Sequence, residues 1–214
     1  MVYVGLDRTG GRMSTEANGD TKATGDQPPT ADELARMPRD ADRHELLDGA
    51  LLVSPRPSPL HQVIAARLSG MLASSCPEGM AVLPRPVIRL SRSTVLTADL
   101  TVVRHRPPGE GPLTEPPLLA AEVRAAGPAP AADRRAAAYA AFGVWSYWLL
   151  KLDVRWPELT VFELADGRYE RVARAVGGEV FRARQPFFAE IIPARLTAGL
   201  RPADRPRDTM GVTA

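Results

Sequence analysis

Two short apolar runs, each carrying one acidic residue, constrain what this chain can fold into. The runs are TADLTVV at residues 97–103 and LLAAEV at residues 118–123, and their acids are Asp99 and Glu122. Both runs have the length and apolar character of buried strands. A carboxylate inside an apolar strand is costly unless it is paired, hydrogen-bonded or bound to a metal. If the two strands were neighbours, a hard divalent cation would relieve the repulsion between the acids. Separate salt bridges to arginines are the alternative.

Length and composition limit the class of protein. The chain has 214 residues, which suits one domain with a sizeable core, and its formal net charge of +2 is too small to indicate nucleic-acid binding by itself. Cys76 is the only cysteine, so a disulfide within the chain is excluded, and the lysines are limited to Lys22 and Lys151. No apolar run is long enough to cross a membrane. We therefore expect a soluble cytoplasmic protein.

Local signals predict an α+β or mixed α/β fold with one central sheet. Residues 1–29 are polar and are expected to form a disordered arm, residues 30–197 one domain, and residues 198–214 a loose tail. A capping box at 30–33, a Ser-Pro pair at 58–59 and an alanine-rich stretch at 131–142 predict helices. Asp-Gly pairs at 48–49 and 166–167 predict hairpins, and the prolines within 81–91 predict an edge strand.

Several further residues are candidates for a site. Glu45 lies just before the first predicted hairpin turn, where a solvated or arginine-paired acid is the ordinary interpretation. His61, in the first turn of the second predicted helix, is interpreted as a local hydrogen-bonding residue. Arg135 and Tyr139 are four residues apart and share one face of the third predicted helix. Other arginines cluster near Asp99 and would contact phosphates or form a solvated surface; they are Arg85, Arg89, Arg92, Arg104 and Arg106.

Four segments, in this order, resemble the Uma-two family of restriction endonucleases, a branch of the PD-(D/E)xK nuclease superfamily. They are HELLDGALLVSPRPSPLHQ at 44–62, ADLTVV at 98–103, PPLLAAEV at 116–123 and RRAAAYAAFGVWSYWLL at 134–150. The resemblance covers roughly residues 31–196. It implies a restriction-endonuclease-like mixed sheet flanked by helices. It also implies an endonuclease that hydrolyses DNA phosphodiester bonds with Mg²⁺ or Mn²⁺ as cofactor. By position, Asp99, Glu122 and Glu45 match the family's metal-binding acids, and the backbone carbonyl of Val123 is a further candidate ligand.

The chain departs from the family pattern at three places. Ala98 stands where the family has a proline, and the sequence from Arg124 to Pro128 replaces a Ser-Pro-Ser-like segment. Arg135 falls at or near the position of the family's lysine. Arginine stabilises phosphate charge but does not deprotonate, so it cannot act as a base. Arg124, which follows Glu122 in an acid-x-basic triplet, and Lys151 are the other cations that could replace the lysine.

Three hypotheses for the function follow. The first is a Mg²⁺-dependent DNA endonuclease of weak activity, with Asp99, Glu122, Arg135 and Arg124 as its catalytic residues. The second is a catalytically inactive relative that binds nucleic acid or protein, and the third is a structural domain in which both acids are salt-bridged. DNA is the expected partner if the site is active, no membrane association is expected, and a homodimer is left open. Because the three histidines are scattered, they do not form a zinc motif.

Overall fold

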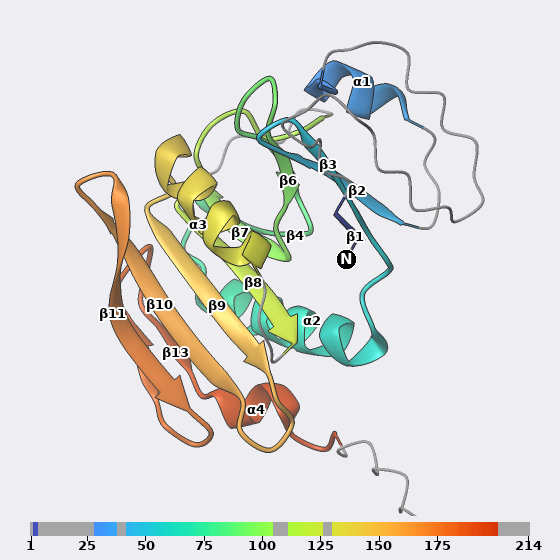
Figure 1. The fold of residues 1–214 in the computed structure, drawn as a ribbon. Coiled ribbons are helices and arrows are strands. Elements are labelled where there is room, and N and C mark those ends of the chain that lie inside the picture. Colours follow the sequence, from blue (N-terminus) through green and yellow to red (C-terminus); the bar gives the residue numbers. More distant parts are fainter. Residues whose placement is uncertain (1, 4–27, 38–41, 105–110, 126–129, 201–214) are drawn as a thin grey trace, which may run out of the picture.

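The computed structural model describes residues 2–3, 28–37, 42–104, 111–125 and 130–200. Within these residues the strands form two larger sheets and one small one (Figure 1). The six-stranded sheet has the order β11-β10-β9-β8-β7-β4, with strands Arg168–Val176, Glu158–Ala165, Ser146–Leu152, Leu119–Ala125, Leu100–Arg104 and Met80–Pro84. The five-stranded sheet has the order β1-β3-β2-β6-β5, with strands Val2–Tyr3, Ala50–Ser54, Arg43–Leu47, Val95–Thr97 and Val87–Arg89. The small sheet pairs β12, Phe181–Ala183, with β13, Ala189–Ile191.

The six-stranded sheet is mixed, because β8 and β9 are parallel whereas its other neighbouring strands are antiparallel. Two parallel strands need a crossover connection, and helix α3, Pro130–Phe142, supplies it between β8 and β9. The predicted α+β fold with a mixed sheet flanked by helices is therefore confirmed.

The core lies on both faces of the six-stranded sheet. Helix α2, Pro59–Ser75, buries Ile64, Leu68 and Leu72 against the face that carries Leu119 and Ala121 of β8. Helix α3 buries Tyr139 against the other face, beside Ala120 and Tyr147, and leucines of the five-stranded sheet complete this second cluster. Figure 1 shows α3 in front of β8 and β9 and α2 behind them. Alternate residues of β8 therefore face the two helices, as the period of a strand requires.

Most local predictions are confirmed. Thr30 and Glu33 form the capping box of helix α1, Ala31–Arg36, and Ser58 caps α2. Both Asp-Gly pairs have positive φ at both residues, which is the backbone that two-residue hairpin turns require. The strand predicted at 81–91 divides into β4, which contains Pro84, and β5, which follows Pro86, and each lies at the edge of its own sheet. The last described helix is α4, Pro193–Thr197, and no described helix is long and apolar enough to cross a membrane.

Four other predictions require correction. The run at 97–103 is not one strand: β6 ends at Thr97 in one sheet and β7 begins at Leu100 in another, so Asp99 lies at the crossing between sheets. For the same reason the predicted single central sheet is joined by a second, five-stranded sheet. Residues Val2–Tyr3 of the predicted arm form β1, which pairs with β3, while 4–27 lie outside the described residues. In the predicted tail, Leu200 packs against the core, and residues 201–214 are not described.

Candidate active site

Asp99 and Glu122 are brought together by the register of β7 and β8. Leu100 pairs with Ala121 in this antiparallel ladder, and the Asp99 N–H donates to the Ala121 carbonyl at 3.1 Å. The paired register ends at Leu100 and Ala121, so Asp99 immediately precedes β7 and Glu122 is the next residue along β8. The sheet thus brings together the two acids that the sequence singled out.

The Asp99 carboxylate replaces a missing stretch of strand. Its Oδ2 accepts a hydrogen bond of 2.7 Å from the backbone N–H of Val123. This N–H has no backbone partner on β7, because the pairing of β7 with β8 ends at Leu100 and Ala121. The same oxygen lies 3.1 Å from Nε2 of His61, in the first turn of α2. No described group donates to Oδ1. Asp99 therefore has a structural role at the sheet junction and retains one carboxylate oxygen for another partner.

Glu122 is 5% exposed and faces helix α3. Its Oε1 accepts hydrogen bonds from Nε and Nη2 of Arg135, at 2.9 and 2.6 Å, and from the Tyr139 hydroxyl at 3.3 Å. Arg135 and Tyr139 reach the same oxygen because they are one helical turn apart on α3. Among the described residues, no donor contacts Oε2 of Glu122.

Glu45 lies on β2 in the other sheet and is 1% exposed. Its Oε1 accepts a hydrogen bond from the Thr97 N–H at 2.6 Å, and its Oε2 accepts one from Nη1 of Arg135 at 2.9 Å. Nε of Arg43 forms an additional ion pair with Oε2 at 3.3 Å. Arg135 also donates from Nη2 to the Thr97 carbonyl at 3.1 Å. One guanidinium therefore joins α3 to both large sheets through Glu122 and Glu45.

The electrostatics of this group keep Arg135 charged. Burial alone would lower the pKa of Arg135, but the carboxylates of Glu122 and Glu45 outweigh burial and hold that pKa well above its usual value. Burial, and then the negative charge of Glu122, raise the pKa of Tyr139 well above its usual value. Arg135 is consequently a permanent cation, and Tyr139 is a neutral hydrogen-bond donor.

The donor set fits a hard cation only in part. Both oxygens of Glu45 are hydrogen-bonded, whereas Asp99 and Glu122 each have one oxygen without a described donor. No group of three or more His, Cys, Asp or Glu side chains arranged to hold a metal ion occurs in the described part of the chain. The residues present thus offer two carboxylates to an ion, with Glu45 committed to Arg135.

The other candidate cations lie beyond Glu122 along the same strands. Arg124 pairs in register with Lys151 of β9, two residues past the pair formed by Glu122 and Leu149, so both cations share the face of Glu122. Arg124 is partly buried and Lys151 exposed, and neither forms a salt bridge with another described residue. They lie toward the carboxyl ends of the parallel strands, where open α/β sheets usually bind ligands.

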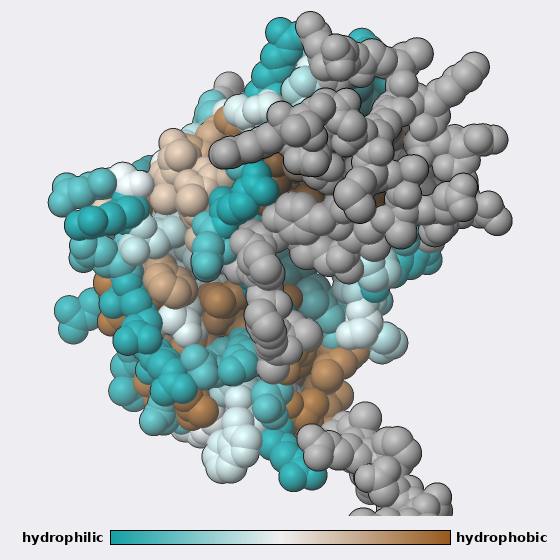
Figure 2. Space-filling view, in the orientation of Figure 1, coloured by the Kyte–Doolittle hydropathy of each residue, from teal (hydrophilic) through white to brown (hydrophobic). Residues whose placement is uncertain are grey.

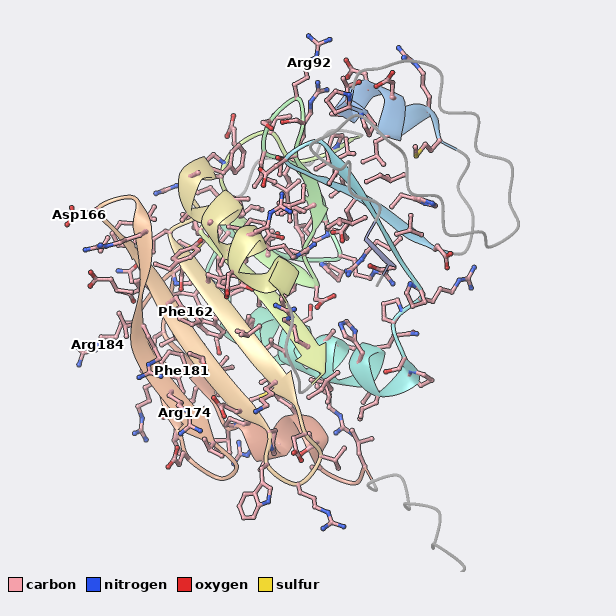
Figure 3. The ribbon with its side chains drawn as sticks, in the orientation of Figure 1. Arg92, Phe162, Asp166, Arg174, Phe181 and Arg184 are labelled. Atoms are coloured by element: carbon pink, nitrogen blue, oxygen red, sulfur yellow. The ribbon has the colours of Figure 1, made fainter. Side chains whose placement is uncertain are left out.

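Of the arginines predicted around Asp99, Arg85 adjoins it, because the Arg85 N–H donates to the Asp99 carbonyl at 2.9 Å. Arg89 forms an ion pair with Asp32 of α1 at 2.9 Å, and Arg92 projects outward beside α1, far from the β10–β11 hairpin (Figure 3). Arg106 lies outside the described residues. Conversely, sequence reasoning did not predict the contact of His61 with Asp99. The only signal for it was the position of His61 at the end of the segment 44–62.

Comparisons with known proteins agree with this fold. The family model Uma2, described as "Putative restriction endonuclease", matches residues 31–196. The crystal structure of "a putative nuclease belonging to DUF820 from Anabaena variabilis" is similar, with a TM-score of 0.62 and 16% sequence identity. The match covers 79% of this chain and 98% of that one. No curated protein matches the chain.

Proposed function

This chain belongs to the Uma2 family of restriction-endonuclease-like proteins, and we propose that it hydrolyses DNA phosphodiester bonds weakly, with Mg²⁺ or Mn²⁺ as cofactor. The observation that supports the proposal is that Asp99 bonds the two neighbours of Glu122 on β8, Ala121 and Val123, while each acid keeps one carboxylate oxygen that no described group contacts. Carboxylate oxygens are the ligands that hard divalent cations prefer.

Asp99 and Glu122 would hold the ion. The backbone carbonyl of Val123 would be a further ligand. The N–H of Val123 points toward Asp99, and the N–H and C=O of one strand residue point to the same side of the strand. Glu45 becomes a ligand of the ion only if it gives up its hydrogen bonds to Arg135 and Thr97. When bound, the ion would supply an activated water and neutralise phosphate charge.

The chain's own cations would orient the DNA. Arg124 and Lys151 lie on the face of Glu122, where their side chains can contact phosphates on one side of the scissile bond. Arg135 contributes fixed positive charge next to Glu122. It cannot remove a proton from water, because the arginine side chain stays protonated in proteins. Losing one stabiliser of transition-state charge costs roughly 10²–10³ in rate, so we expect slow cleavage.

The position of Arg135 also favours a second function. Its guanidinium makes four hydrogen bonds, to Glu122, Glu45 and Thr97. A cation held in this way competes with a metal ion for Glu122. The alternative is therefore a catalytically inactive relative that binds nucleic acid without cleaving it.

The test is divalent-dependent nicking of supercoiled plasmid by the wild type, Asp99→Ala and Arg135→Lys. Slow nicking by the wild type that Asp99→Ala abolishes and Arg135→Lys accelerates is the expected result. Mn²⁺ affinity is measured in parallel by calorimetry. Metal binding without nicking would support the inactive relative, and no metal binding at all would overturn the site. Fast wild-type cleavage would overturn the predicted cost of replacing the lysine.

A further inference from the structure

An apolar pocket of about 360 Å³ lies on the α3 face of the six-stranded sheet. One wall is the alanine side of α3, formed by Ala136, Ala137 and Ala140, and the opposite side is the β10–β11 hairpin. Figure 2 shows apolar surface continuing from α3 toward the neighbouring strands, bordered by the hydrophilic hairpin. Small side chains on the helix leave the space open, and the volume is within the range of small-ligand sites.

Aromatic rings line the pocket. Tyr147, Phe162 and Tyr169 form one cluster, in which Tyr147 and Tyr169 stack with centroids 5.4 Å apart and Phe162 lies 6.0 Å from Tyr147. Figure 3 shows Phe162 midway along the sheet, well away from Asp166 at the hairpin tip. Phe162 and Tyr169 are only partly buried, so their rings can offer flat faces to a planar partner.

Tyr147 carries an unsatisfied polar group. The residue is 2% exposed, and its hydroxyl is buried with no hydrogen-bond partner among the described residues. The neighbouring Tyr169 hydroxyl, in contrast, donates to the Val144 carbonyl at 2.9 Å. Leaving a buried hydroxyl without a partner is costly, and a polar group of a ligand that reached it would remove that cost.

The pocket adjoins the candidate active site. Leu149 of its lining pairs in register with Glu122, and Tyr147 pairs with Ala120 on the same face. Neighbouring strands lie about 4.8 Å apart, so the β9 wall of the pocket is one strand away from Glu122. Asp133 and Arg168 line the rest of the pocket and are both exposed, so a hydrogen-bond acceptor and a cation are present beside the apolar interior.

We propose that this pocket holds the base of one unpaired nucleotide of the DNA that the protein binds. The assignment rests on the proposed function, because it takes nucleic acid as the substrate class. A base fits the chemistry: it is planar, stacks on aromatic rings and carries polar edges for the Tyr147 hydroxyl and the Asp133 carboxylate. Arg168, with Arg124 and Lys151 along the strands, complements the charge of the flanking phosphates.

The test compares two fluorescein-labelled single-stranded oligodeoxynucleotides, one normal and one fully abasic, with equal numbers of phosphates. Binding of the full-length protein is measured by fluorescence anisotropy in EDTA at fixed salt, so neither metal nor cleavage enters. We expect the normal strand to bind about five- to 150-fold more tightly, which corresponds to one base–aromatic stack. Equal affinity for both strands would overturn the pocket.

Ala137→Trp fills the pocket from its exposed helical position, and Ala141→Trp is the matched control on an exposed position of α3 that does not line it. Ala137→Trp should reduce normal-strand affinity to that of the abasic strand, whereas Ala141→Trp should not. Tyr147→Phe should weaken normal-strand binding without lowering the thermal midpoint. If Ala137→Trp retains the preference for the normal strand, the base lies elsewhere. Failure of the two proposals is distinguishable: base-dependent binding without nicking overturns catalysis only.

Discussion

Arg135 is a buried cation between two buried carboxylates, and its contacts are set by the fork of the guanidinium. It is 5% exposed and bonds Glu122 with Nε and Nη2 while Nη1 bonds Glu45. A lysine has one point charge and cannot reproduce this fork. At this scale a single guanidinium therefore forms a permanent link between two sheets.

Replacing Arg135 by alanine should lower the free energy of unfolding by about 3–5 kcal/mol, because two buried carboxylates lose their shared cation. Urea denaturation at neutral pH measures the change. Arg174→Ala is the control, since Arg174 forms an exposed pair with Glu158 and its loss should hardly move the denaturation midpoint. Equal midpoints for Arg135→Ala and the wild type would show that the buried ion pairs contribute no net stability.

Substitutions at Asp99 separate its structural role from metal binding. Asp99→Asn keeps an acceptor for the Val123 N–H but removes the charge, so stability should be nearly retained while Mn²⁺ affinity falls. Asp99→Ala leaves that N–H unpaired and should cost about 1–3 kcal/mol. Thermal unfolding and calorimetric titration give the two readouts. Metal affinity that survives in Asp99→Asn would remove Asp99 from the ligand set.

At the scale of elements, the ends of helices are fixed by backbone conformation. Gly143 ends α3 with φ of +91°, in the left-handed region that glycine adopts without strain. This turn directs the chain from α3 into β9 and so completes the crossover that makes β8 and β9 parallel. Gly70 differs, because it lies within α2 and faces open space.

Two glycine-to-alanine substitutions should therefore act with opposite sign. Gly143→Ala should destabilise the protein by about 1 kcal/mol through strain at positive φ, although a Cβ there would meet only ordinary contact with Pro116 at 3.6 Å. Gly70→Ala should stabilise it by about 0.5–1 kcal/mol, because alanine favours the helix interior. Chemical denaturation of both variants is the measurement. Two shifts of the same sign would contradict the argument from φ.

At the scale of the whole molecule, buried tyrosines couple stability to alkaline pH. Burial is the main cause that raises the pKa of Tyr139, Tyr147 and Tyr169 above the ordinary value of 10.0. A folded-state pKa above the unfolded one means that the stabilisation is fully present below about pH 10 and is lost as the pH rises further.

We expect these three tyrosines to ionise only as the protein unfolds. Absorbance at 295 nm, recorded with near-ultraviolet circular dichroism from pH 8 upward, should show their ionisation and the loss of tertiary structure together. Tyr169→Phe serves as the amplitude control, because one of the delayed ionisations should disappear. If the three tyrosines ionised near pH 10 in a protein with native dichroism, the packing of α3 on the sheet would be looser than described.

The sequence by itself determined the features that depend on neighbours along the chain. The capping box at Thr30, the two Asp-Gly turns, the helix that ends at Gly143 and the edge positions of β4 and β5 all follow from local backbone preferences. The acid-bearing runs, read with the family resemblance, also identified Asp99, Glu122 and Arg135 as one site. Their roles in metal binding and catalysis remain predictions.

Only the tertiary structure decided which partners these residues have. The run at 97–103 divides between two sheets, because the sheet that each half joins depends on strands distant in sequence. His61 reaches Asp99 across 38 residues, and Arg135 reaches Glu45 across 90. A single sequence carries no local signal for such contacts, because burial forces each charged group to find a partner but does not say which one. The packing of α2 and α3 on opposite faces of the six-stranded sheet determines these partners.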